Sequence, residues 1–158
     1  MAESREKDLC AKFGRIVVKQ LPPNSDLVEG IKKTCVDNGI RYGAILTTVG
    51  SVHELSIVVP GPMLKDKHEA SRKDLVIPGP LQVLSLVGVI FEKDTGEMDV
   101  HLHGSFLGVD GKIYGGDLEG KSPVLARLVT VIGEVADVRL IEKFDEEYQQ
   151  RFLRAETL

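Results

Sequence analysis

The sequence predicts an α+β protein: a mostly antiparallel β-sheet, one main helix after the first strand, and a further helix at the C-terminus. Three observations support this class. Apolar runs of strand length recur along the chain, separated by glycine and proline turn signals. One early segment has apolar residues at clear helical spacing. Strands and helices do not alternate regularly, which argues against a doubly wound parallel sheet.

Length and composition indicate one globular domain. The chain has 158 residues, 42% of them hydrophobic and 28% charged, with a formal net charge of −4. This acidic balance argues against direct nucleic-acid binding, which normally needs a basic patch. No apolar run approaches the length of a membrane span, and the charged N-terminus does not look like a signal peptide. With only Cys10 and Cys35, no disulfide framework is expected, and a cytoplasmic location is predicted.

We divide the chain into a flexible N-terminus (1–12), a domain (13–142) and a charged C-terminal helix or tail (143–158). A first strand is predicted from Phe13 to Leu21, ended by Pro22-Pro23. A helix follows near Asp26, capped by Asn24 or Ser25 and ended by Asn38-Gly39. Its apolar stripe is Leu27, Val28, Ile31, Cys35 and Val36, so Cys35 is expected to be a core residue.

The middle of the chain predicts a series of strands with charged or proline-rich connections. The expected strands cover 40–50, 52–59, 76–77, 81–91, 97–107 and 113–118. The nearly continuous apolar run from Leu81 to Phe91 predicts a strand buried on both faces. The charged stretch from Met63 to Asp74 predicts a loop with His68 at the surface, and His53 is expected to be structural or exposed.

The last third of the chain predicts two more strands and then a helix. The strands cover 128–132 and 135–141. From Glu142 onward the sequence is charged, and its apolar residues recur near helical spacing: Phe144, Tyr148, Phe152 and Leu153. We therefore expect a terminal helix that docks loosely on the domain or on a neighbouring subunit.

The strand from Glu97 to Leu107 carries the most informative motif. His101 and His103 are two residues apart, so they point to the same face of a sheet. Asp117 returns on the following strand, and its position depends on the turn at Asp110-Gly111. A two-residue loop would point Asp117 to the opposite face. A three-residue loop, with Gly111 in the left-handed conformation, would place Asp117 opposite His103. We predict the three-residue loop.

Two imidazoles and one carboxylate on one face predict a metal site. Neutral imidazole nitrogens and a carboxylate oxygen suit Zn²⁺ or Mn²⁺, with Fe²⁺ as a further candidate. Three protein ligands leave positions open for water or substrate, as in catalytic sites. Gly115-Gly116 would also let another backbone or a ligand approach beside Asp117. The alternative is that the two histidines are structural, because His-x-His on a strand also occurs by chance.

From about Gly14 to Ile141 the sequence resembles the PPC domain, the "plants and prokaryotes conserved" domain. The matching motifs follow one another at the family's order and spacing: Ser25-Asp26-Leu27, Val49-Gly50-Ser51-Val52, Val83-Leu84-Ser85-Leu86-Val87-Gly88, His101-Leu102-His103 and Gly115-Gly116-Asp117-Leu118-Glu119-Gly120. The resemblance implies a compact α+β domain and a homotrimer with pockets between subunits. It also implies that His101 and His103 are metal ligands. The family's third histidine falls on Asp117, a departure that leaves the identity of the metal open.

Three functional hypotheses follow. The first is a metal-dependent hydrolase of a small carbonyl compound, a lactone or other ester. Its general base would be Glu119 or Glu134, and Arg41, Arg72 or Lys121 would anchor an anionic substrate. The second is a non-enzymatic DNA-binding or regulatory assembly module, although the chain has no AT-hook of the kind found in plant relatives. The third is a trimeric domain with structural histidines and an unrelated ligand.

Overall fold

The computed structural model describes residues 8–64 and 70–158. In these residues the elements are β1 (Lys12–Leu21), α1 (Leu27–Asn38), β2 (Gly43–Met63), β3 (Ala70–Lys93), β4 (Met98–Gly108), β5 (Ile113–Leu118), β6 (Val124–Ala136), β7 (Val138–Asp145) and β8 (Gln150–Thr157). The strands form one sheet in the order β1-β6-β2-β5-β4-β3-β7-β8, and β2 also pairs with β3. Among the strands of the described residues, only β3 and β7 pair in parallel. The predicted α+β class with a mostly antiparallel sheet is confirmed.

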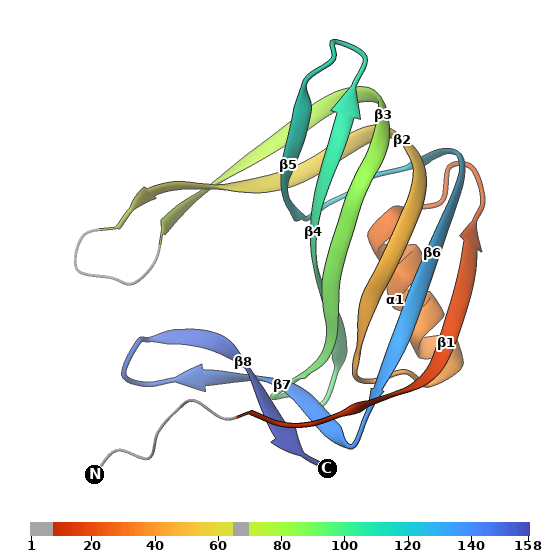
Figure 1. The fold of residues 1–158 in the computed structure, drawn as a ribbon. Coiled ribbons are helices and arrows are strands. Elements are labelled where there is room, and N and C mark those ends of the chain that lie inside the picture. The colour runs from red at the N-terminus through yellow and green to blue at the C-terminus, as the bar shows by residue number, and fades with distance from the viewer. Residues whose placement is uncertain (1–7, 65–69) are drawn as a thin grey trace.

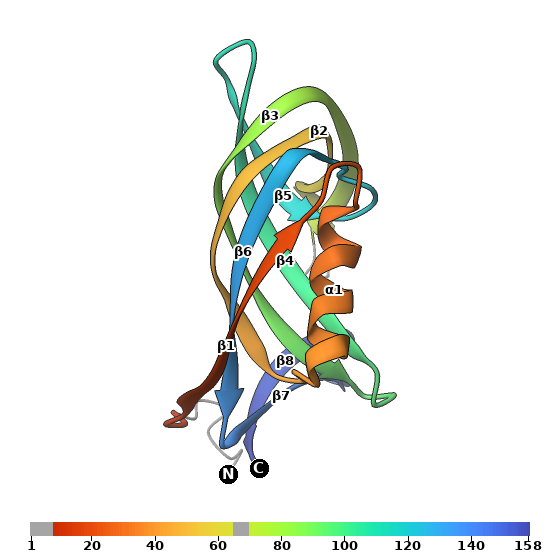
Figure 2. The same ribbon diagram turned by 90° about the vertical axis from the view of Figure 1, so that its right-hand side faces the viewer.

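The helix α1 covers one face of the sheet, and the main core lies between the two (Figures 1 and 2). Leu27, Ile31 and Cys35 of α1 are fully buried there, as is Phe106 of β4. The prediction that Cys35 is a core residue is confirmed, and burial raises the pKa of its thiol to about 11. Cys10 is also free, and it is exposed.

Both ends of α1 are capped, but the N-cap differs from the prediction. Asp26 is the N-cap, and its Oδ1 accepts a hydrogen bond from Glu29 N at 2.9 Å. Gly39 ends the helix at φ 66°, as its position after Asn38 predicts. The prediction of Asn24 or Ser25 was wrong because Asp26 has a second partner far along the chain. Its Oδ2 accepts a hydrogen bond from Ser122 N at 2.7 Å.

The strands β2 and β3 are longer than predicted and form a bent hairpin. Pro60 lies inside β2, and Pro78 and Pro80 lie inside β3, where the sequence predicted interruptions. The β2–β3 pairing shifts register at Val52/Glu54 and at Pro60/Met63. Such bulges let a sheet accommodate proline, which cannot donate a backbone hydrogen bond to the ladder. We call residues 54–63 and 70–78 the arm; it projects away from α1 (Figure 1).

The predicted loop between Met63 and Asp74 is correspondingly shorter. Met63 belongs to β2 and pairs with Ala70 of β3. Residues 65–69, with the surface prediction for His68, lie outside the described residues. His53 of β2 is exposed, which agrees with one of the two alternatives predicted for it, structural or exposed.

The face of the sheet that points away from α1, the outer face, carries exposed apolar side chains. Leu84 and Val87 of β3 are 47% and 53% exposed, so the prediction that residues 81–91 are buried on both faces was wrong. Val49 of β2 and Val129 of β6 pair on the same face and are also exposed. Each of these residues lies next to a buried one, as alternation along a strand requires.

The C-terminus forms the hairpin β7–β8, so the predicted terminal helix was wrong. Phe144 pairs with Arg151, and Lys143 with Phe152, in an antiparallel ladder. Asp145 is 6% exposed, and its side chain accepts hydrogen bonds from the backbone of the turn and from Arg154. Pairing of β7 with the end of β3 extends the sheet to this segment, which overrides its helical spacing.

Residues 1–7 of the predicted flexible N-terminus lie outside the described residues, and β1 begins at Lys12. Within the described part of the chain, no helix has the length and apolar character needed to cross a membrane.

Candidate metal centre

The hairpin between β4 and β5 sets the position of the candidate site. Gly108 N donates to Lys112 O at 2.9 Å, and Gly111 N donates to Gly108 O at 3.0 Å. Gly111 has φ 75°, in the left-handed region that glycine adopts without strain. The loop therefore contains three residues, Val109 to Gly111, and His103 pairs with Asp117. The predicted register is confirmed.

Asp110 holds this turn through its side chain. Its Oδ1 accepts a hydrogen bond from Lys112 N at 3.1 Å, and its Oδ2 accepts one from the Tyr114 hydroxyl at 2.8 Å. Asp-Gly suits both turn types, but these two contacts stabilise the longer loop. Local side-chain chemistry thus brings Asp117 to the face of the two histidines.

His101, His103 and Asp117 converge on one another through single ligand atoms. The Nε2 atoms of the two histidines are 3.0 Å apart. Asp117 Oδ1 lies 2.8 Å from His103 Nε2 and 3.2 Å from His101 Nε2. The three atoms form a nearly equilateral triangle open to solution, since the histidine side chains are 50% and 58% exposed.

This donor set fits a divalent metal ion. Separations of this size are expected between neighbouring ligands of an ion whose bonds are about 2.0–2.2 Å long. The three side chains are the only such cluster of histidine, cysteine and acidic groups in the described residues. The same contacts also fit a hydrogen-bonded trio, in which shared protons occupy the place of an ion.

Arg72 and Glu119 lie beside the cluster. Arg72 comes from β3 in the arm, forms an ion pair with Glu119, and lies 4.0 Å from Asp117 Oδ2. The hydrogen bond to Glu119 raises the pKa of Arg72, so its guanidinium stays charged. The structure thus places two of the predicted substrate and base residues at the site.

Two other predicted residues lie elsewhere in the chain. Glu134 of β6 accepts hydrogen bonds from Arg15, which lower the pKa of the Glu134 carboxyl. Arg41 pairs with Glu92 near the turn at Gly96. Within one chain neither residue is brought to the histidines: β2 separates β6 from β5 in the sheet, and Glu92, the partner of Arg41, pairs with Met98 at the start of β4.

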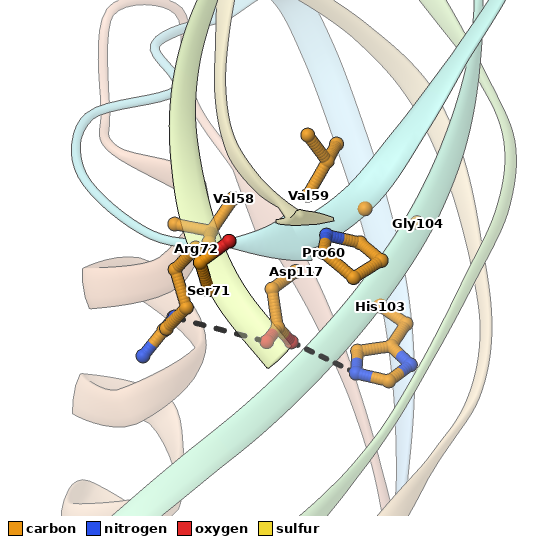
Figure 3. Close-up of a pocket in the computed structure, with 9 residues that line it drawn as sticks. Val58, Val59, Pro60, Ser71, Arg72, His103, Gly104 and Asp117 are labelled. Carbon is orange, nitrogen blue, oxygen red and sulfur yellow. Dashed lines mark ion pairs between the residues drawn. The ribbon is translucent and has the colours of Figure 1, made fainter. Parts of the chain in front are cut away.

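Two pockets meet at the cluster. The arm pocket has a volume of about 410 Å³ and lies between the arm and the β4–β5 hairpin (Figure 3). The helix pocket, of about 730 Å³, lies between α1 and the edge of β4, and Lys121 lines it. The helix pocket runs along the part of β4 that precedes His103. The β4–β5 ladder starts at His103, so among the described residues β5 does not pair with this part of β4.

The arm pocket contains residues that the sequence did not indicate. Val58, Val59, Pro60 and Ser71 line it. They reach the site because Val58 of β2 pairs with Asp117 of β5, a contact between distant segments. Gly116 allows this approach, since a Cβ there would lie 2.5 Å from the Val58 carbonyl oxygen. The expectation that a backbone approaches this glycine pair is confirmed.

Comparison with solved structures supports the fold. A metal-containing protein from Archaeoglobus fulgidus is 24% identical, with a TM-score of 0.75, covering 94% of this chain and 99% of that one. A plant- and prokaryote-conserved (PPC) protein from Pyrococcus horikoshii is 23% identical, with a TM-score of 0.74, covering 97% and 100%. A protein from Bacteroides thetaiotaomicron, for which DNA binding has been suggested, is 16% identical, with a TM-score of 0.75, covering 91% and 96%.

A comparison with curated protein sequences finds no match. The family described as the Plants and Prokaryotes Conserved (PCC) domain matches residues 9–136, most of the chain. This match spans β1 to β6 and includes the whole candidate metal centre. The chain therefore belongs to the Plants and Prokaryotes Conserved domain family.

Proposed function

We propose that the protein is a divalent-metal-dependent hydrolase that acts on a small carbonyl compound, a lactone or other ester. The observation that supports it best is the convergence of two imidazole nitrogens and one carboxylate oxygen at an accessible site. The description of the Archaeoglobus fulgidus protein as metal-containing is consistent with a metal in this fold. Zn²⁺ and Mn²⁺ suit the mixed nitrogen and oxygen ligands, and Fe²⁺ is a further candidate.

His101, His103 and Asp117 would hold the ion. A bound divalent ion would supply Lewis-acid chemistry, polarising a carbonyl group and making water more acidic. Glu119 is the proton acceptor: it takes a proton from water as the water oxygen bonds to the carbonyl carbon. When the C–O bond of the ester breaks, the leaving oxygen takes that proton, so the products are a carboxylic acid and an alcohol. Arg72 holds the Glu119 carboxylate in place through their ion pair and can orient the carbonyl oxygen.

The test of the metal centre is elemental analysis of the purified protein by mass spectrometry. We expect about one ion per chain, and at least about tenfold weaker binding in Asp117→Ala, because a direct ligand is lost. The matched control is Asp37→Ala, an exposed aspartate on α1 that pairs with Lys33 one turn away. Absence of metal from the wild type, even after reconstitution with Zn²⁺ and Mn²⁺, would contradict the proposal.

Catalysis is tested separately from metal binding. Acid release from a panel of lactones and esters is followed with the metal-loaded protein and after chelator treatment. We expect hydrolysis that disappears with the metal and returns on reconstitution. A metal-loaded protein that hydrolyses none of the panel would leave a binding function for the same centre.

The second candidate is a DNA-binding or regulatory module. It is favoured by the suggestion of DNA binding for the Bacteroides thetaiotaomicron protein. The formal charge of −4 weighs against it. Duplex DNA titrated against the protein in fluorescence anisotropy tests the DNA-binding form of this candidate: an affinity that falls steeply with salt would support it, and no binding at low salt would exclude direct DNA binding.

We also propose that the protein is a homotrimer in the cytoplasm. Free thiols at Cys10 and Cys35 suit a reducing compartment. The exposed apolar side chains of the outer face, such as Val49 and Val87, suit contact with further copies of the chain. Light scattering should give the mass of a trimer, and Val87→Lys should lower it. Val36→Lys, on the exposed side of α1, should leave it unchanged.

A further inference from the structure

The metal centre lies on the boundary between the two pockets. His103 lines only the arm pocket, and His101 lines only the helix pocket. Asp117 and Arg72 line both. A substrate whose carbonyl group lies at the metal centre can therefore extend into both pockets.

The arm pocket is apolar away from the metal centre. Val58, Val59 and Pro60 form one wall, and the backbone at Gly104 and Gly116 contributes another. Its polar side chains are Ser71, the two predicted ligands His103 and Asp117, and the neighbouring Arg72. Figure 3 shows Val59 and Pro60 above Asp117 and His103, with Arg72 on the side of Asp117 away from His103. Such a wall favours hydrocarbon and offers little to a charged group.

The helix pocket is polar, and most of its charges are already paired. Asp99 accepts hydrogen bonds from both Lys32 and Lys93, at 2.7 and 2.6 Å. Glu119, on the same wall, pairs with Arg72. Paired charges present hydrogen-bonding groups and leave less need for a counter-ion, so an uncharged polar group fits best, with Lys121 of the lining as a further hydrogen-bond donor.

We infer that the substrate is an amphipathic ester or lactone, with a short apolar acyl chain in the arm pocket and an uncharged polar head in the helix pocket. This inference rests on the proposed function for the position of the carbonyl group. The order follows from the lining residues: the acyl chain lies on the His103 side of the centre, and the head lies on the His101 side. The binding of the acyl chain and the polar head depends on the two pockets, whereas hydrolysis also depends on the metal centre.

The experiment measures binding of amides that mimic such esters and resist hydrolysis. The probes are N-acetyl, N-butanoyl and N-hexanoyl derivatives of aminopropanediol, which share one uncharged polar head. Isothermal titration calorimetry is performed with the protein in metal-loaded and metal-free form. Each buried methylene should tighten binding about fourfold, so butanoyl should bind at least about tenfold more tightly than acetyl.

Two variants assign the chain-length effect to the arm pocket. Val59→Phe fills that pocket and should remove the gain from acetyl to butanoyl while the metal content stays unchanged. The matched control is Val76→Phe, at an exposed valine of the arm that lies outside both pockets. If Val59→Phe fails to fold, as judged by circular dichroism, Ser71→Phe on the facing strand provides the same obstruction.

The outcomes separate this inference from the proposed function. A wild-type affinity that does not change with chain length, in a metal-loaded protein, would overturn the inference and leave the metal centre intact. Equal chain-length gains in Val59→Phe and wild type would also overturn it. Chain-length dependence in a protein that binds no metal would support the ligand class, although the hydrolase proposal would fail.

Discussion

Along β4, neighbouring residues serve two different surfaces. Leu102 and Phe106 are buried between the sheet and α1, with 2% and 0% of their surface exposed. His101 and His103 alternate with them and are about half exposed on the opposite face. The inner face thus has dense apolar packing, and the outer face has an accessible polar cluster. Because one strand supplies both, substitutions in β4 can separate stability from metal binding.

The largest effect is expected at Phe106 on the inner face. Phe106→Ala should lower the free energy of unfolding by about 3–5 kcal/mol, because a fully buried ring is replaced by a cavity. Urea denaturation followed by circular dichroism measures the change. A loss below about 1 kcal/mol would show that the inner face of β4 does not carry the core.

At His103 the expected effect falls on metal affinity instead. His103→Ala should weaken metal binding by at least about tenfold, because one of three ligands is lost, while unfolding changes by less than about 1 kcal/mol at this exposed position. Competition with a chromogenic chelator measures the affinity, and urea denaturation measures the stability. A large stability loss with unchanged metal affinity would identify the histidines as structural and remove the contrast between the faces.

A buried pair of threonines tests how much stability is lost when a buried hydroxyl group has no hydrogen-bond partner. Thr48 and Thr130 are buried, and their hydroxyl groups are 2.9 Å apart. Thr130→Val should cost about 1–3 kcal/mol, because the Thr48 hydroxyl loses its partner. The double variant Thr48→Val with Thr130→Val should recover part of that loss. A double variant less stable than the single one would contradict this coupling.

The smallest effect is expected at Asp99, at the start of β4 in the helix pocket. Its folded-state pKa is lowered, so its contribution to stability is present above the unfolded value near 3.8 and is lost as pH falls through the folded pKa. Asp99→Asn should remove about 1 kcal/mol or less at neutral pH and flatten the stability profile below pH 4. Unfolding measured from pH 7 to pH 2 tests this, and an unchanged acid profile would contradict it.

Local signals predicted the parts of the fold that local interactions stabilise. The burial of Leu27, Ile31 and Cys35 and the end of α1 at Gly39 follow from helical spacing and a left-handed glycine, whereas Val36 of the predicted stripe is 66% exposed. The alternation at His101 and His103 and the chemistry of Asp110-Gly111 led to the right β4–β5 register. All of these depend on contacts between residues close in the sequence, which the sequence displays directly.

The errors occurred where distant segments decide the structure. Helical spacing in residues 144–153 was outweighed by the β7–β8 ladder and its attachment to β3. Pro60 and Pro78 did not end strands, because bulges in the long β2–β3 pairing accommodate them. Asp26, rather than Asn24 or Ser25, caps α1 because Ser122 fixes its carboxylate.

By itself, the sequence determined the two-residue spacing of the histidines, the turn that returns Asp117 to them, and the helix that covers the core. Each follows from backbone geometry over a few residues. Only the tertiary structure decided which cationic side chain lies beside the His101, His103 and Asp117 cluster and which residues line the pockets around it. Arg72 and Val59 reach Asp117 because β2 pairs with β5 across more than fifty residues of chain. Such a contact is selected by the packing of the whole sheet, and no local pattern encodes it.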